Sequence, residues 1–197
     1  MKGNSRIKLG KGFTFSLAEL LYWRLFLTAS SGGGKSYAIR KLCEETHGKV
    51  QQVIIDPDGD FATLREKYAY VLVGGDDADF PCSVKGVSAI LRAIVETNAS
   101  FILDISGLPA TEHKKTGGEN RFAFVGAFLE GLMSLGKKHR RALLVVVDEA
   151  HVFAPEKGRE PSSLYGMTLL SSQGRKKGFA AIYATQRVSK INKDAIA

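Results

Sequence analysis

The chain has 197 residues and a formal net charge of +8 at pH 7, with 44% hydrophobic and 24% charged residues. These values are typical of a soluble globular protein of about one domain, and the absence of any apolar run near the roughly 20 residues that cross a bilayer excludes a membrane-spanning segment within it. The excess of basic residues permits binding to nucleic acid without establishing it.

The N-terminus and the cysteines predict a cytoplasmic protein. Residues 1–11 are basic, but neither an apolar stretch nor a cleavage pattern follows them, so we expect no signal peptide. Cys43 and Cys82 show neither CxxC spacing nor a metal-binding pattern and are expected to be reduced thiols. Residues 1–23 are expected to form an arm or a short hairpin ahead of the main domain, which we place at residues 24–197.

A glycine-rich loop follows the first strand of that domain. The strand is predicted over Arg24–Thr28, and residues 29–36 then read Ala-Ser-Ser-Gly-Gly-Gly-Lys-Ser. Consecutive glycines let the backbone turn its N–H groups toward a phosphate, and a helix predicted over Lys35–Thr46 would point its positive dipole end there. The pattern predicts a nucleotide-phosphate loop for ATP, although its first position is Ala29 rather than Gly. The residues expected to hold the nucleotide are Ser30, Ser31, Gly32, Gly33, Gly34, Lys35, Ser36 and Tyr37.

Two residues of this loop have predicted chemical roles. Lys35 would reach the β- and γ-phosphates as a catalytic cation, and the Ser36 hydroxyl would take one position on Mg²⁺. A tight turn between a strand and a helix is the alternative interpretation of the glycines.

Strands and helices are predicted to alternate through the rest of the chain. Such alternation predicts an α/β fold, with a mostly parallel sheet and helices on both faces. The further strands are expected at Val50–Asp56, Ala69–Val73, Phe101–Ile105, Ala142–Asp148 and Phe179–Thr185. The further helices are expected at Phe61–Lys67, Val84–Thr97, Asn120–Leu135 and Ser163–Gln173.

Two carboxylates stand at the end of the predicted strand Ala142–Asp148. Its uninterrupted apolar run indicates a strand buried on both faces, and ligands bind at the carboxyl ends of such strands. Asp148 would hold Mg²⁺, and Glu149 would orient and polarise the water that attacks the γ-phosphate. Acids also occur in the first turn of helices, but the phosphate loop and the acid pair each predict the other.

With both motifs placed, the chain from about Leu9 onward resembles the HerA-type helicase/translocase ATPases of the HerA–FtsK branch of P-loop proteins. The resemblance is carried by residues 29–36, by Ile-Ile-Asp-Pro-Asp-Gly-Asp-Phe at 54–61 and by Val-Val-Val-Asp-Glu-Ala-His-Val-Phe-Ala-Pro-Glu at 145–156. It is also carried by the segment 173–187, which runs from Gln-Gly-Arg-Lys-Lys-Gly-Phe to Ala-Thr-Gln-Arg.

The resemblance implies a RecA-like fold and a hexameric ring acting on double-stranded DNA. Gln186 matches a polar residue that follows the strand between the phosphate-loop and Asp-Glu strands, where its amide would sense the γ-phosphate or hold the attacking water. Arg175 matches the arginine that ring-forming relatives offer to a neighbouring subunit's ATP. Asp56 and Asp60 match acidic positions, the second of which is usually Glu. Residues 24–197 are expected to lack the family's C-terminal elements.

Several alternatives remain open. The chain could instead be an ATP-dependent assembly or signalling module that organises an effector such as a nuclease, or a motor for secretion or conjugation. The residues 175–177 could be a basic helix end, and 56–59 a simple turn. Trp23 is expected in the core, and His151 is expected to be a packed or capping residue. The basic residues that a DNA motor would place in its pore are Lys114, Lys115, Lys137, Lys138, Arg140 and Arg141.

Overall fold

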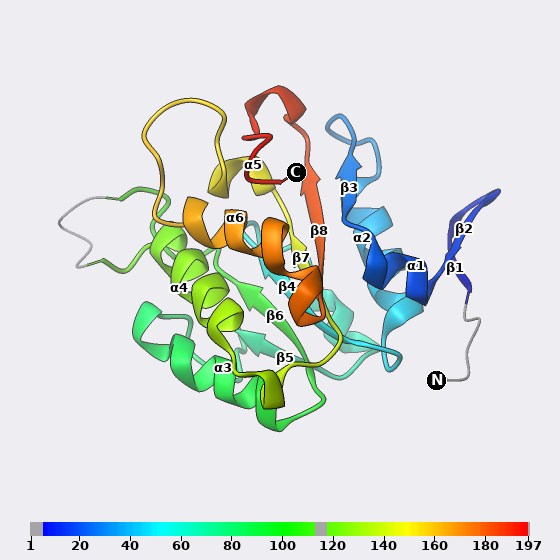
Figure 1. The fold of residues 1–197 in the computed structure, drawn as a ribbon, viewed down its shortest axis with the longest axis horizontal. Helices are drawn as coiled ribbons and strands as arrows, with labels where there is room; N and C mark the ends of the chain where they lie inside the picture. Colours follow the sequence, from blue (N-terminus) through cyan, green and yellow to red (C-terminus); the bar gives the residue numbers. More distant parts are fainter. Residues whose placement is uncertain (1–5, 113–117, 197) are drawn as a thin grey trace.

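A computed structural model describes residues 6–112 and 118–196, and its centre is a parallel sheet of six strands (Figure 1). The strand order is β3-β8-β7-β4-β6-β5, so β8 lies between the strand that precedes the glycine-rich loop and the strand that precedes the acid pair. The strands are β3 (Leu25–Thr28), β4 (Gln51–Asp56), β5 (Tyr70–Val73), β6 (Ser100–Asp104), β7 (Leu143–Val147) and β8 (Phe179–Thr185).

Helices cover both faces of this sheet, as the alternating sequence predicts (Figure 1). One face packs against α3 (Val87–Glu96), α4 (Arg121–Ser134) and α6 (Leu164–Gln173), and the other packs against α2 (Lys35–Thr46). Successive side chains of a strand point to opposite faces. Val145 and Val147 therefore join the first core cluster, whereas Leu144 and Val146 join the second.

The N-terminal segment packs on the second face. Strands β1 (Arg6–Gly10) and β2 (Phe13–Ser16) pair antiparallel, and Ile7 and Phe15 are buried against α2. Helix α1 (Leu17–Tyr22) follows directly and was not expected from the sequence. It begins with a capping box, in which Ser16 accepts from the Glu19 backbone and the Glu19 carboxylate accepts from the Ser16 backbone.

The remaining elements are short. Helix α5 (Ala150–Phe153) follows the acid pair. The 3₁₀ turns are η1 (Ala62–Glu66), η2 (Val84–Gly86), η4 (Lys137–His139), η5 (Arg175–Lys177) and η6 (Val188–Lys190). The predicted helix at 61–67 is thus a 3₁₀ turn. None of the helices in the described ranges is long and apolar enough to cross a membrane.

Candidate functional site

The glycine-rich loop has a backbone that larger residues would not adopt. Gly32 and Gly34 have φ values of 74° and 85°, in the left-handed region that favours glycine. Gly33 is required for a different reason, because a Cβ atom there would lie 2.9 Å from the Ser30 carbonyl oxygen. The Gly33 amide also donates to that oxygen at 2.8 Å. The loop is therefore closed on itself just before α2 begins at Lys35.

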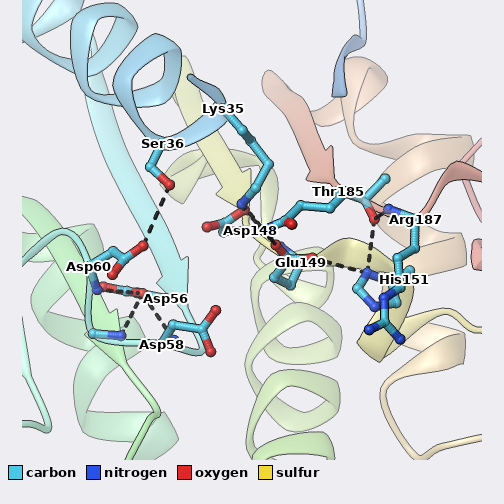
Figure 2. A network of polar contacts seen from close by, with 12 residues as sticks. Lys35, Ser36, Asp56, Asp58, Asp60, Asp148, Glu149, His151, Thr185 and Arg187 are labelled. Carbon is cyan, nitrogen blue, oxygen red and sulfur yellow. Dashed lines mark hydrogen bonds and ion pairs between the residues drawn. The ribbon is translucent and has the colours of Figure 1, made fainter. Parts of the chain in front are cut away.

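Lys35 joins this loop to the acid pair (Figure 2). Its side chain is almost completely buried, and its Nζ donates to Asp148 Oδ1 and lies 3.0 Å from Glu149 Oε1. Burial alone would lower the pKa of Lys35, but the contacts with the two carboxylates outweigh it and raise the pKa. Lys35 is therefore a charged group at neutral pH, held between the loop and the end of β7.

Asp148 directs one free oxygen into the site. Its Oδ1 accepts from Lys35 and from the Glu149 amide, whereas its buried Oδ2 has no hydrogen-bond partner among the described residues. Burial raises the pKa of Asp148, and the contacts with Lys35 oppose that rise. A buried carboxylate oxygen without a partner is a ligand that suits a hard cation.

The Ser36 hydroxyl is the second oxygen near this position. It lies 3.5 Å from Asp60 Oδ2, and Figure 2 shows the two side chains pointing toward each other. Within residues 6–112 and 118–196, no three His, Cys, Asp or Glu side chains converge on a metal position. The donors that are present fit Mg²⁺, which usually takes only one or two carboxylates and completes its ligands with phosphate and water.

Glu149 is held by contacts on both carboxylate oxygens. Its Oε1 lies near Lys35 and accepts from Gln186 Nε2 at 3.1 Å, and its Oε2 lies 3.1 Å from His151 Nδ1. Its backbone has φ 43° and ψ 44°, a left-handed conformation that costs a non-glycine residue about 1–3 kcal/mol. Such strain concentrates at functional sites, where the surrounding contacts fix the residue.

His151 and Thr185 form a support for Glu149 that the sequence analysis did not identify. The Nδ1 atom of His151 lies 2.8 Å from Thr185 Oγ1, and the same hydroxyl oxygen accepts from the Arg187 amide at 3.0 Å (Figure 2). Burial lowers the pKa of His151, although the nearby Glu149 opposes this shift. The sequence offered one indication of a role for Thr185. It is a polar residue at the end of an otherwise apolar strand, directly before Gln186.

Asp56 builds the turn that presents Asp60. Its carboxylate accepts from four consecutive backbone amides, those of residues 58–61, at 2.8–3.3 Å. Burial raises its pKa to about 6, even though these hydrogen bonds favour the charged form. Asp56 is fully occupied by the turn, and Asp60 is the acidic residue of this segment that faces Ser36.

Arg175 does not meet the other predicted site residues within the chain. It begins η5, which precedes β8, and therefore lies at the amino end of the parallel sheet. Lys35, Glu149 and Gln186 follow the carboxyl ends of their strands. The seven residues of β8 separate the two edges by about 20 Å, at roughly 3.3 Å per residue.

Some of the expected basic and aromatic residues have other roles. Arg141 donates to Gln51 Oε1 at 2.9 Å and to backbone carbonyls at the end of α3, and Arg140 donates to the Leu135 carbonyl at 2.9 Å. Lys114 and Lys115 lie outside the described residues. The prediction that Trp23 is a core residue is wrong, since its side chain is 52% exposed.

Comparisons with known proteins find that part of the chain is similar to the helicase HerA. Residues 14–78 match the family model described as the central domain of helicase HerA. A 54-residue segment is 41% identical to the DNA double-strand break repair helicase HerA of Pyrococcus furiosus; it spans 27% of this chain and 10% of that protein. These matches confirm the resemblance to HerA-type ATPases and agree with the predicted enzyme class, an ATPase.

Solved structures show a similar fold over most of the chain. VirB4 of Thermoanaerobacter pseudethanolicus matches with a TM-score of 0.63 and 14% identity, over 100% of this chain and 80% of that one. The genome packaging NTPase B204 of Sulfolobus turreted icosahedral virus 2, in complex with ATP-gammaS, matches with a TM-score of 0.51 and 17% identity, over 87% of this chain and 68% of that one. The predicted RecA-like α/β fold of P-loop ATPases is confirmed.

Proposed function

We propose that this chain is the motor domain of a ring-forming, Mg²⁺-dependent ATPase that acts on double-stranded DNA in the cytoplasm. One observation supports the proposal above all. Beside the closed glycine loop, Lys35 contacts both Asp148 and Glu149, and Glu149 accepts from Gln186. The DNA assignment is supported by relatives described as a DNA break repair helicase and a genome packaging NTPase.

Each residue of the site has a distinct task in this proposal. Lys35 exchanges its carboxylate partners for the β- and γ-phosphates when ATP binds. Glu149 accepts the proton of the attacking water, and the Gln186 amide orients that water or the γ-phosphate. Ser36 and Asp148 hold Mg²⁺, which neutralises phosphate charge when bound.

Hydrolysis would require a second subunit. Arg175 cannot reach the phosphate loop of its own chain, because the length of β8 separates them. In a closed homo-oligomeric ring, for which we propose six subunits, the same residue can face the nucleotide of the next copy. A guanidinium is always charged and forms two parallel hydrogen bonds to a phosphoryl group.

ATP turnover with and without duplex DNA tests the proposal. We expect hydrolysis to depend on Mg²⁺ and to rise when duplex DNA is added to the oligomeric protein. Binding to DNA should tolerate any sequence and fall steeply between about 50 and 200 mM salt, because phosphate contacts release counterions. ATP turnover with no response to DNA, together with no duplex binding at low salt, would contradict the DNA assignment.

A second candidate function is an ATP-dependent assembly module that organises an effector such as a nuclease. The contacts of Arg140 and Arg141 favour it, because these two predicted DNA contacts donate instead to backbone carbonyl oxygens and side-chain amide oxygens of their own chain. In that case ATP would change the oligomeric state or recruit the effector, and DNA would leave turnover unchanged. Measuring oligomer size with ATP, alongside the DNA assay, separates the two functions.

A further inference from the structure

A polar, aromatic cleft lies at the edge of the sheet opposite to the phosphate loop. Its volume is about 390 Å³. One wall carries Tyr22, Trp23 and Arg24, and the other carries Ser171, Arg175 and Lys176. Lys35, Glu149 and Gln186 do not line it, so it is separate from the site that binds the nucleotide of the same chain.

The central contact of this cleft is a stack between Arg175 and Tyr22. The guanidinium carbon of Arg175 lies 3.6 Å from the centre of the Tyr22 ring. Within residues 6–112 and 118–196, no carboxylate forms an ion pair with this guanidinium and no hydrogen bond of its side chain is present. A guanidinium stacked on an aromatic face still has its N–H groups around its edge, where they can bind a phosphate bidentately.

Tyr22 belongs to a helix that packs on the core, although the residue itself is 57% exposed. Helix α1 is fixed at its start by the capping box, and its Leu20 is buried against the core that contains α2. At the other end, Arg24 donates to the Ser171 carbonyl at 3.3 Å, which ties the start of β3 to the end of α6. The helix that carries Tyr22 is therefore anchored on both sides, and the ring lies beside an exposed arginine on a short turn.

We propose that Tyr22 is a positioning residue that holds the Arg175 guanidinium in place for the ATP bound to Lys35 of a second copy of this chain. The occupant of the cleft is then the triphosphate of the neighbouring subunit, because the chain's own loop lies about 20 Å away along β8. The inference rests on the shared active site proposed above. It also gives the exposed α1, which lies ahead of the phosphate loop, a part in hydrolysis.

The test compares two substitutions of the same ring. Tyr22→Leu removes the aromatic face, and Tyr22→Phe retains it. We expect Tyr22→Leu to lower kcat about 10-fold to 10²-fold, the loss typical of a misplaced catalytic group, with KM for ATP and oligomer size unchanged. Tyr22→Phe should turn over like the parent. So should Phe13→Leu, which removes an aromatic ring from a hairpin residue of nearly the same exposure, 56%.

The double variant Tyr22→Leu/Arg175→Ala separates positioning from a general effect on the fold. If Tyr22 acts through Arg175, the double variant should be no slower than Arg175→Ala alone. A further loss in the double variant, or parental kcat in Tyr22→Leu while Arg175→Ala is slow, would overturn the role of Tyr22 and leave the shared site intact. Parental kcat in Arg175→Ala would overturn both the shared site and this inference.

Discussion

Lys35 is the cation that contacts two buried carboxylates, and this arrangement determines what its loss would do. In Lys35→Ala, Asp148 and Glu149 would remain buried without their cation, and the contacts with Lys35 that oppose the raised pKa of Asp148 would be lost. We expect this variant to lose ATP hydrolysis completely, because the phosphate clamp is absent. Turnover assays should show parental activity for Lys41→Ala, a matched change on the same helix that removes only an i,i+4 pair with Glu45.

Glu149 can be tested without disturbing its backbone. Glu149→Gln keeps the size of the side chain and the oxygen that accepts from Gln186, but it cannot take a proton from water. ATP binding should persist while turnover falls by at least the ~10²-fold typical of losing a positioned base. Binding by fluorescent nucleotide and turnover should be measured together, with the exposed Glu156→Gln as the control. Full turnover by Glu149→Gln would remove the assignment of the base.

The hydroxyl of Thr185 should matter to the same reaction. Thr185→Val keeps the shape of the buried side chain but removes the oxygen that contacts His151 Nδ1 and accepts from the Arg187 amide. Without it the imidazole loses its anchor beside Glu149, so we expect kcat to fall about tenfold with little change in KM. Thr185→Ser, which retains the oxygen, should restore kcat. Equal kcat in the Val and Ser variants would show that the contact does not position Glu149.

At the scale of elements, the phosphate loop depends on close backbone approach at Gly33. A methyl group there would lie 2.9 Å from the Ser30 oxygen and 3.0 Å from the Ala29 Cβ, so the loop must open. We expect Gly33→Ala to weaken ATP binding by about tenfold or more, because opening the loop costs binding free energy. A tenfold loss of affinity corresponds to ~1.4 kcal/mol. Gly136→Ala is the matched control, because Gly136 has φ −63° and no atom within 4 Å of its added methyl. Isothermal titration with ATP measures both, and unchanged affinity in Gly33→Ala would show that the loop tolerates a side chain.

Most strands of the sheet could be predicted from the sequence because they are buried on both faces, whereas β3 at the edge of the sheet is only half-buried. Each appears as a short apolar run, and the boundaries of β4 and β7 lie within one residue of the predicted ones. Helix α1 has only six residues and is stabilised by its capping box and tertiary packing, so its apolar periodicity is too short to detect. The segment 61–67 was predicted as a helix, but its backbone follows the turn around Asp56 and forms η1.

The parts of the candidate site that could be predicted are the residues that directly follow strands of the sheet. Asp148 and Gln186 lie at the carboxyl ends of neighbouring parallel strands, so their proximity to the loop follows from the strand order. The left-handed backbone of Glu149 and the contact between His151 and Thr185 depend on packing between distant segments. The turn at 56–59 was one of the alternatives that the sequence left open, whereas the contact of Thr185 with His151 was missed, because only the position of a polar residue at the end of an apolar strand pointed to it.

At the scale of the whole molecule, the proposed catalytic groups lie at two opposite ends of the parallel strands. The phosphate loop, Asp148 and Glu149 lie at the carboxyl edge, and Arg175 lies at the amino edge on an exposed turn. On this proposal a single copy would bind ATP but would lack the second cation for hydrolysis. Turnover per chain should rise with protein concentration as rings form, since an arginine supplied in trans contributes about 10³–10⁵ to the rate of P-loop enzymes.

Mixing two inactive variants tests this division. Lys35→Ala lacks the loop cation but retains Arg175, whereas Arg175→Ala binds ATP but offers no arginine. Mixed rings contain interfaces that join an intact loop to an intact arginine, so the mixture should recover part of the parental turnover although each variant alone stays inactive at high concentration. Glu149→Gln mixed with Lys35→Ala is the control, because the loop and the base belong to the same copy and no mixed interface restores both. If mixing restores nothing, concentration has no effect and Arg175→Ala matches the parent, then Arg175 is an exposed helix-end cation and each chain hydrolyses ATP alone.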